Sequence, residues 1–277
     1  MAILGIIAIL CLYPFLYTLT ISLSTAAEAS RPGLHLYPRE ISLSSYQIVL
    51  TNPDILTGYI NTILRTILGT TISVLGCAIA AYPLARKEMP ARSLITFLIV
   101  FTMLFNGGMV PNYLLIQKLG LLNSIFALVI PSALSAFNII IIKNFFQSLP
   151  ESLVESARID GAGEWRILFQ IYIPLSKPVL ATVALWSSVF HWNAWFDALL
   201  YITDDSKQVL QTFLQRIVVE NSSQLMELGV TGTSVMQFAP ETIKAATIII
   251  TILPIICIYP FIQKYFVKGI MLGGVKE

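Results

Sequence analysis

Six long stretches of apolar residues, separated by polar segments, constrain the fold of this chain more than any other feature. They cover residues 2–24, 59–84, 93–110, 124–142, 178–202 and 242–265. An α-helix rises about 1.5 Å per residue, so roughly 20 apolar residues cross the hydrocarbon core of a bilayer. The sequence therefore predicts an all-α integral membrane protein with six transmembrane helices in a single domain, residues 1–277, of which 56% are hydrophobic.

The first apolar stretch has a rival interpretation as a secretory signal peptide. Ala27, Glu28 and Ala29 follow it and imitate a small-residue cleavage site. However, no basic region precedes the stretch, which is also longer than the hydrophobic region of a signal peptide, typically about 7–15 residues. We therefore interpret residues 2–24 as the first span.

Basic residues are distributed unevenly between the two sides of this topology. Ten lysines and arginines fall on the side of the second loop, the fourth loop and the tail. They are Arg86, Lys87, Arg92, Lys143, Arg158, Arg166, Lys177, Lys264, Lys268 and Lys276. The other side has six over much longer segments. The positive-inside rule thus predicts that the first side, with both termini, is cytoplasmic.

The cysteines and the charge indicate neither a metal site nor a nucleic-acid partner. Cys11, Cys77 and Cys257 lie in apolar stretches without C-x-x-C spacing, as expected of packing residues. His35 has no second potential ligand at helical or turn spacing. The net charge of +2 says little about partners.

The polar segment between the fourth and fifth spans, residues 144–177, reads as two short helices with a hinge. Pro150 and Glu151 are typical of a helix start. Gly161 and Gly163 are typical of a helix end, since glycine adopts the left-handed conformation readily. A second helix is predicted from an apolar stripe closed by a proline, formed by Trp165, Leu168, Phe169, Tyr172 and then Pro174.

The spacing of this segment resembles the coupling motif of the membrane subunits of ATP-binding-cassette (ABC) importers, which reads E-A-A, three residues, G, nine residues, I-x-L-P. Ser156 replaces the first alanine and Ile173 the leucine. The resemblance extends over nearly the whole chain and implies a type I ABC importer permease fold with a cytoplasmic coupling helix. It implies that the partner ATPase is contacted by Glu155, Ser156, Ala157, Arg158, Asp160, Gly161, Ile171 and Pro174.

Three further patterns resemble the carbohydrate importers of the maltose-type class. They are residues 80–86, residues 190–197 and the tail 264–276. In the smaller permease of maltose importers the tail reaches the ATPase dimer, which implies that role for Lys268, Gly273, Gly274 and Lys276. Residues 106–111 resemble the branch that carries complex or acidic oligosaccharides.

The same resemblance implies the surroundings of the chain. It implies a multi-pass permease of the bacterial cytoplasmic (inner) membrane that imports sugars or oligosaccharides. Its partners are a second permease, an ATPase dimer that binds ATP and Mg²⁺, and an extracytoplasmic solute-binding protein. Residues 219–239 resemble an external loop that probes the binding protein, although a passive connector fits equally well. A short basic segment that usually precedes the first span is expected to be missing here.

Five residues are candidates for a substrate pathway: Arg65, Trp192, Asn193, Trp195 and Asp197. Aromatic faces suit the C–H surfaces of sugars, and Asn193 or Asp197 can bond hydroxyl groups. The alternative is that the aromatic residues anchor the span at the membrane boundary. Likewise, Arg65 either pairs within the protein or faces inward to bind an acidic oligosaccharide.

The source of energy separates the remaining functions. The chain has no G-x-x-x-x-G-K-[ST] phosphate-binding loop, so we expect it to be a transport subunit without catalytic residues or cofactors of its own. An ion-coupled secondary transporter is the alternative, but Arg65, His191 and Asp197 form a thin ion pathway. A membrane scaffold without transport is third. The coupling motif favours a partner that hydrolyses ATP.

Overall fold

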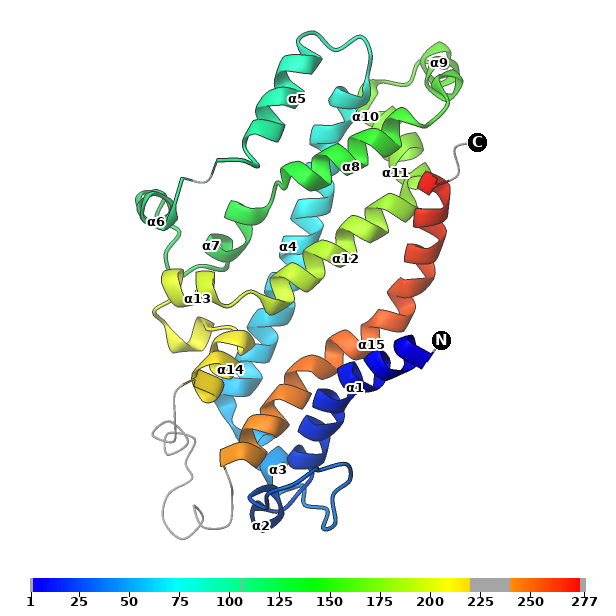
Figure 1. Cartoon of the computed structure of the whole chain (residues 1–277). Helices are drawn as coiled ribbons and strands as arrows, with labels where there is room; N and C mark the ends of the chain where they lie inside the picture. Colours follow the sequence, from blue (N-terminus) through cyan, green and yellow to red (C-terminus); the bar gives the residue numbers. More distant parts are fainter. Residues whose placement is uncertain (1, 106, 220–239, 275–277) are drawn as a thin grey trace. The chain divides into compact units, whose positions relative to one another are not determined.

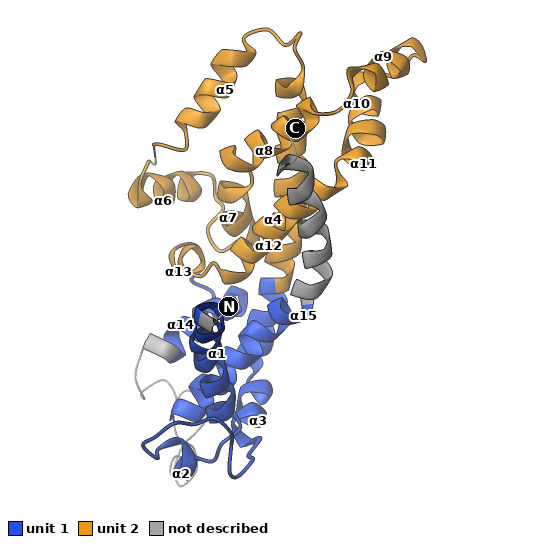
Figure 2. Cartoon of the chain, turned by 45° about the vertical axis from the view of Figure 1, so that its right-hand side comes forward, with its two compact units in different colours: residues 1–62, 203–257 blue, residues 63–202, 258–277 orange. Residues whose placement is uncertain are grey.

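A computed structural model describes residues 2–105, 107–219 and 240–274, and in these ranges the ordered elements are helices (Figure 1). The chain divides into two compact units, which Figure 2 distinguishes by colour. Unit 1 holds residues 1–62 and 203–257, and unit 2 holds residues 63–202 and 258–277. The long helix α4 (Pro53–Ala85) contributes residues to both.

Unit 1 is held together by polar contacts between segments far apart in sequence. Its other helices are α1 (Ala2–Ser22), α2 (Ala26–Ala29), α3 (Ser44–Thr51), η3 (Asp205–Lys207), α14 (Leu210–Val219) and the first part of α15 (Pro240–Gly274). The Ser45 hydroxyl donates to Thr242 Oγ1 at 2.9 Å. The Leu210 amide donates to Thr62 Oγ1 at 2.9 Å. Such buried hydroxyl contacts suit helices in lipid, where a polar group needs a protein partner.

Unit 2 contains the remaining helices. They are α5 (Arg92–Phe101), α6 (Met109–Lys118), α7 (Ile125–Val129), η1 (Ile130–Ser132), α8 (Ala136–Gln147), α9 (Glu151–Ile159), α10 (Glu164–Ile167), η2 (Leu168–Tyr172), α11 (Ile173–Leu175), α12 (Lys177–Asn193) and α13 (Phe196–Tyr201). A buried apolar cluster joins α4, α8, α9 and α12, with Cys77, Ile142, Val154 and Val183 among its members. This cluster places the segment 150–176 against the spans.

Three of the predicted spans are single apolar helices long enough to cross a membrane: Ile3–Ser22, Pro53–Ala85 and Pro240–Cys257. Two more candidates are bent pairs. One pair, Ile125–Ser132 and Ala136–Gln147, bends by 52° where Ser135 caps the second helix by accepting from the Asn138 amide. The other joins Glu164–Leu175 to Lys177–Asn193 at 82°.

The predicted third span, residues 93–110, differs from the structure. Its helix α5 ends at Phe101 and spans only about 15 Å at 1.5 Å per residue. A separate helix, α6, begins at Met109 after Gly108, whose φ of +87° a residue with a side chain rarely adopts. The predicted fifth span, 178–202, is similarly interrupted between Asn193 and Phe196. Both helices therefore end within apolar stretches that composition alone would continue.

Candidate functional site

The helix α9 carries the predicted coupling motif and is amphipathic. Val154 is buried in the apolar cluster and Ala157 packs beside it. Glu155 and Ser156 face away and are exposed. Ile159, at the last turn, is 86% exposed, although it is a large apolar side chain. One face of α9 therefore packs against the apolar cluster of unit 2, and the other face is exposed to solvent.

Gly161 ends α9 in the way that the sequence predicts. Its φ is +77°, in the left-handed region. The Gly161 amide donates to the Arg158 carbonyl at 3.0 Å, and the Ala162 amide donates to the Ala157 carbonyl at 2.9 Å. This pair of bonds is the Schellman motif, in which a glycine lets the chain reverse and satisfies carbonyls at the helix end. Asp160 is exposed at the same turn.

The predicted apolar stripe of the second short helix is wrong in part. Leu168 and Tyr172 are buried, whereas Trp165 is 65% exposed and Phe169 is also exposed. Residues 168–172 form a π-helix, whose i→i+5 bonds change the faces expected for an α-helix after Leu168. The rings of Trp165 and Phe169 instead stack on each other, with centroids 6.1 Å apart.

The remaining motif residues lie on either side of this turn. Ile171 is half-buried against the apolar cluster, and Pro174 is exposed within α11. Pro174 therefore does not close the helix, which continues to Leu175 before the chain bends into α12. The structure brings Ala157 and Ile171 to the same cluster and leaves Glu155 apart from it.

A charged network connects this segment to the end of α4. One carboxylate oxygen of Glu164 accepts a hydrogen bond from the Tyr82 hydroxyl. The other accepts from Arg158, with Nη2 to Oε1 at 2.8 Å. Arg158 also lies 3.8 Å from Glu88, which pairs with Arg86 at 3.2 Å. The bonds from Tyr82 and Arg158 hold the pKa of Glu164 below its usual value.

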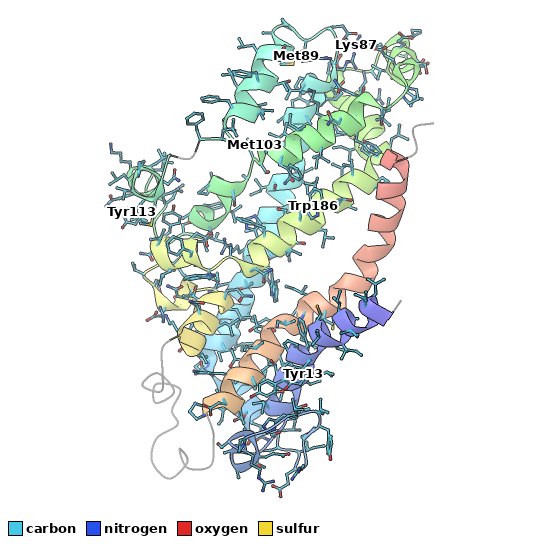
Figure 3. The ribbon with its side chains drawn as sticks, viewed as in Figure 1. Tyr13, Lys87, Met89, Met103, Tyr113 and Trp186 are labelled. Atoms are coloured by element: carbon cyan, nitrogen blue, oxygen red, sulfur yellow. The ribbon has the colours of Figure 1, made fainter. Side chains whose placement is uncertain are left out.

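A cavity of about 500 Å³ lies beside this network. Its lining includes Tyr82, Arg86, Glu88, Met89, Arg158, Glu164 and Trp165. Figure 3 shows Lys87 and Met89 in the loop after α4, at the same end of unit 2 as α9. The network and the cavity were not predicted from the sequence, because Tyr82 and Glu88 are far from Glu164 in it and no spacing rule relates them.

A second constellation lies inside the apolar part of unit 2. Arg65 on α4 is 0% exposed and forms an ion pair with Asp197, whose side chain is 28% exposed. Arg65 Nη1 also donates to the Ala194 carbonyl at 2.9 Å. Ala194 lies in the interruption between α12 and α13. The guanidinium therefore donates to a backbone carbonyl and pairs with a carboxylate at a break in a helix, as expected of a charge buried within a membrane protein.

The other substrate-pathway candidates are dispersed around this ion pair. Trp192 is buried, whereas Asn193 is exposed and donates to the Val189 carbonyl at 2.8 Å. Trp195 is half-buried and contacts Phe196 edge-on, with centroids 5.6 Å apart. Their side chains therefore do not converge on one described cavity.

His191 packs against α4 at a glycine. A Cβ at Gly69 would come within 2.6 Å of His191 Cε1, so the imidazole occupies the space that a side chain would need. In the sequence, only the small residues of the second span indicate that a side chain could approach α4 this closely.

The tail residues are described in part. Lys268, Gly273 and Gly274 belong to the helical backbone of α15. Lys276 and residues 220–239 lie outside the described residues. Within the described ranges, no group of three or more His, Cys, Asp or Glu side chains is arranged to hold a metal ion.

The chain is similar to transport proteins over almost its whole length. It is 40% identical over 270 residues to the polygalacturonan/rhamnogalacturonan transport system permease protein YtcP of Bacillus subtilis (strain 168), covering 97% of this chain and 94% of that protein. Protein LplC of the same organism is 43% identical over 276 residues, which cover 99% of this chain and 92% of that protein.

A solved structure is also similar. It is the crystal structure of a bacterial ABC transporter involved in the import of the acidic polysaccharide alginate, with a TM-score of 0.89 and 37% sequence identity over 96% of this chain and 94% of that one. The chain thus has the type I ABC permease fold. Residues 55–272 match the family described as binding-protein-dependent transport system inner membrane component, and the chain belongs to this family of membrane-embedded transport subunits.

Proposed function

We propose that this chain is one of two permease subunits of an ATP-driven importer of carbohydrates in the bacterial cytoplasmic membrane. A second permease, an ATPase dimer and an extracytoplasmic solute-binding protein complete the importer, and the ATPase binds ATP and Mg²⁺. The observation that carries the proposal is α9, a short helix that is anchored on one face and open on the other, and ends at the left-handed Gly161. Such a helix suits insertion into a partner's cleft.

The open side of the segment also has the character of a docking surface. Ile159, Trp165 and Phe169 are exposed apolar side chains, and Glu155 adds a charge beside them. Exposed aromatic residues with polar neighbours are typical of protein interfaces. We assign the ATPase as the partner, with contacts from the exposed motif residues. Lys268, Gly273, Gly274 and Lys276 of the tail are proposed as a second contact.

The proposed topology has six crossings with both termini in the cytoplasm. The three single helices, the first bent pair and α12 supply five, and the segment that contains α5 supplies the third in chain order. The excess of basic residues in the loop after α4, in residues 143–177 and in the tail favours this orientation. Segment 150–176 then faces the compartment that contains ATP.

We propose sugars or oligosaccharides as cargo, including acidic ones. Two similar proteins, named for polygalacturonan/rhamnogalacturonan transport and for import of the acidic polysaccharide alginate, support this class. Arg65 does not carry the proposal, because its guanidinium is buried against Asp197 and the Ala194 carbonyl. Asn193 and Trp195, which are at least partly exposed, are better placed for contact with cargo.

The Arg65–Asp197 ion pair also weakens the alternative of an ion-coupled secondary transporter. Asp197, the carboxylate that the sequence places within a span, is neutralised by Arg65. A carboxylate that carries protons or sodium has to exchange its partner during transport.

Purification of the complex tests the proposal. We expect the chain to co-purify with an ATPase, and Gly161→Trp to leave membrane insertion intact while abolishing transport-coupled ATP hydrolysis. The αL backbone and the docking face would both be disturbed by the indole. Normal coupled turnover in the Gly161→Trp complex would refute the assignment of α9. A thermal-shift screen of the cognate binding protein with neutral and acidic oligosaccharides tests the cargo.

A further inference from the structure

The carboxylate of Glu164 joins two elements that are distant in sequence. One oxygen accepts from the hydroxyl of Tyr82, in the last turn of α4, and the other from the guanidinium of Arg158, in the last turn of α9. Each oxygen therefore serves a different element. Glu164 itself begins α10, so three helical segments meet at one side chain.

The α4 end of this bridge is held firmly. The Tyr82 side chain is buried, and its ring packs edge-on against Tyr172, with centroids 5.0 Å apart. Tyr172 packs in the same way against Phe146 of α8, again at 5.0 Å. The buried, packed ring directs its hydroxyl at the carboxylate of Glu164. The hydrogen bond from Tyr82 therefore links the carboxylate of Glu164 directly to α4.

Around the bridge, α9 is attached in two physically different ways. Val154 and Ala157 pack into the apolar cluster, and this attraction is non-directional. On the other side lies the cavity of about 500 Å³, where the facing side chains include the bridging groups themselves. Hydrogen bonds are directional, so Glu164 restricts the orientation of α9 on α4 in a way that apolar contact does not.

We propose that Glu164 and Tyr82 are positioning residues for energy coupling. Through Arg158 they tie the coupling helix to the end of α4, so that a displacement of α9 by the ATPase moves that span with it. The inference rests on the proposed function and deepens it, since none of these contacts is needed for α9 merely to dock. Apolar packing keeps α9 in place when the bridge is removed, and what is lost is the transmission of its movement.

The test uses the complete importer reconstituted in proteoliposomes with its binding protein. Tri-galacturonate and raffinose are offered in parallel as cargo, and uptake and ATP hydrolysis are measured together. The variants are Glu164→Gln, which keeps the size of the side chain without its charge, Tyr82→Phe, which keeps the ring packing, and the double variant. Glu151→Gln is the matched control, because Glu151 of α9 pairs at 2.9 Å with Lys87 of the loop after α4, but both side chains are exposed and the pair is screened by solvent.

We expect Glu164→Gln and Tyr82→Phe to assemble normally and to keep their basal ATP hydrolysis. The number of sugars imported per ATP should fall about fivefold in each, because a hydrogen bond to a charged group is lost. The double variant should fall no further than Glu164→Gln, since that substitution has already removed the charged acceptor of the Tyr82 bond. Glu151→Gln should retain the wild-type ratio.

Two results would overturn these claims, and they can be told apart. If the wild-type complex does not use ATP to import any oligosaccharide that its binding protein binds, the proposed function fails and the inference fails with it. If the wild-type complex imports sugar and Glu164→Gln has an unchanged ratio of uptake to hydrolysis, only the inference is refuted. A loss that appears equally in Glu151→Gln would also refute it, because any charge removed from the segment would then have the same effect.

Discussion

Replacement of Asp197 by alanine tests how the buried charge in this chain is used. The Arg65 guanidinium is 0% exposed, and Asp197→Ala would leave it without its carboxylate partner. Removal of one partner from a buried ion pair costs about 3–5 kcal/mol. Because the Asp197 side chain is 28% exposed and Arg65 keeps its bond to Ala194, we expect Asp197→Ala to lower the free energy of unfolding by about 2–3 kcal/mol.

The assay is thermal unfolding of the purified chain in lipid nanodiscs. A loss of 2–3 kcal/mol should lower the midpoint by roughly 5–10 °C for a chain of this size. Asp205→Ala is the matched control, because Asp205 lies 3.8 Å from Arg216 in a solvent-exposed pair and should change the midpoint by about 1 °C or less. The double variant Arg65→Met/Asp197→Ala should recover most of the loss, since no charge is then left unpaired.

If Asp197→Ala were as stable as Asp205→Ala, Arg65 would not depend on the carboxylate. The alternative role of Arg65, binding an acidic oligosaccharide, would then regain support.

Three further predictions follow from individual contacts. Gly69→Ala should destabilise the chain by about 1–2 kcal/mol, because its Cβ would overlap the buried His191 ring, and a fall in the thermal midpoint would show this. Gly76→Ala is its control, since the nearest atom there, Leu134 Cδ2 at 2.8 Å, ends a flexible and exposed side chain and should move aside; equal losses would contradict the argument. Gly161→Ala should cost about 1–2 kcal/mol by backbone strain alone, since no atom lies within 4 Å of the added Cβ, and a stabilised variant would exclude the left-handed turn. The pKa of Glu164 is lowered from its ordinary value of 4.5, so its ionised carboxylate should stabilise the fold at pH values above 4.5, and this stabilisation should be lost as the pH falls through the lowered pKa. Wild type and Glu164→Gln should therefore differ in stability at neutral pH and converge at acid pH. A difference in stability that grows on acidification would contradict this.

Much of the fold could be predicted from apolar run length. Residues 2–24, 59–84 and 242–265 each correspond to a long helix, because an uninterrupted apolar run leaves the backbone few alternatives in lipid. The third span could not be predicted in this way. There α5 ends at Phe101 within the apolar run, and a separate helix, α6, begins after Gly108, whose φ is +87°.

The coupling segment shows a similar division. The end of α9 at Gly161 follows from a local rule, and the Schellman bonds agree with it. The predicted apolar stripe is buried only at Leu168 and Tyr172, and the π-helix at residues 168–172 departs from the α-helical period on which the stripe was predicted. The bridge from Tyr82 to Glu164 is a tertiary contact over 82 residues, which no spacing in a single sequence reveals.

If this chain forms part of a sugar importer, the energy for import comes from an ATPase partner. The most direct measurement is uptake of radiolabelled oligosaccharide into proteoliposomes that contain the reconstituted complex, with the binding protein outside and ATP inside. We expect uptake that requires ATP and the binding protein and persists when ion gradients are collapsed. Uptake that proceeds without ATP and stops when the proton or sodium gradient is collapsed would contradict it.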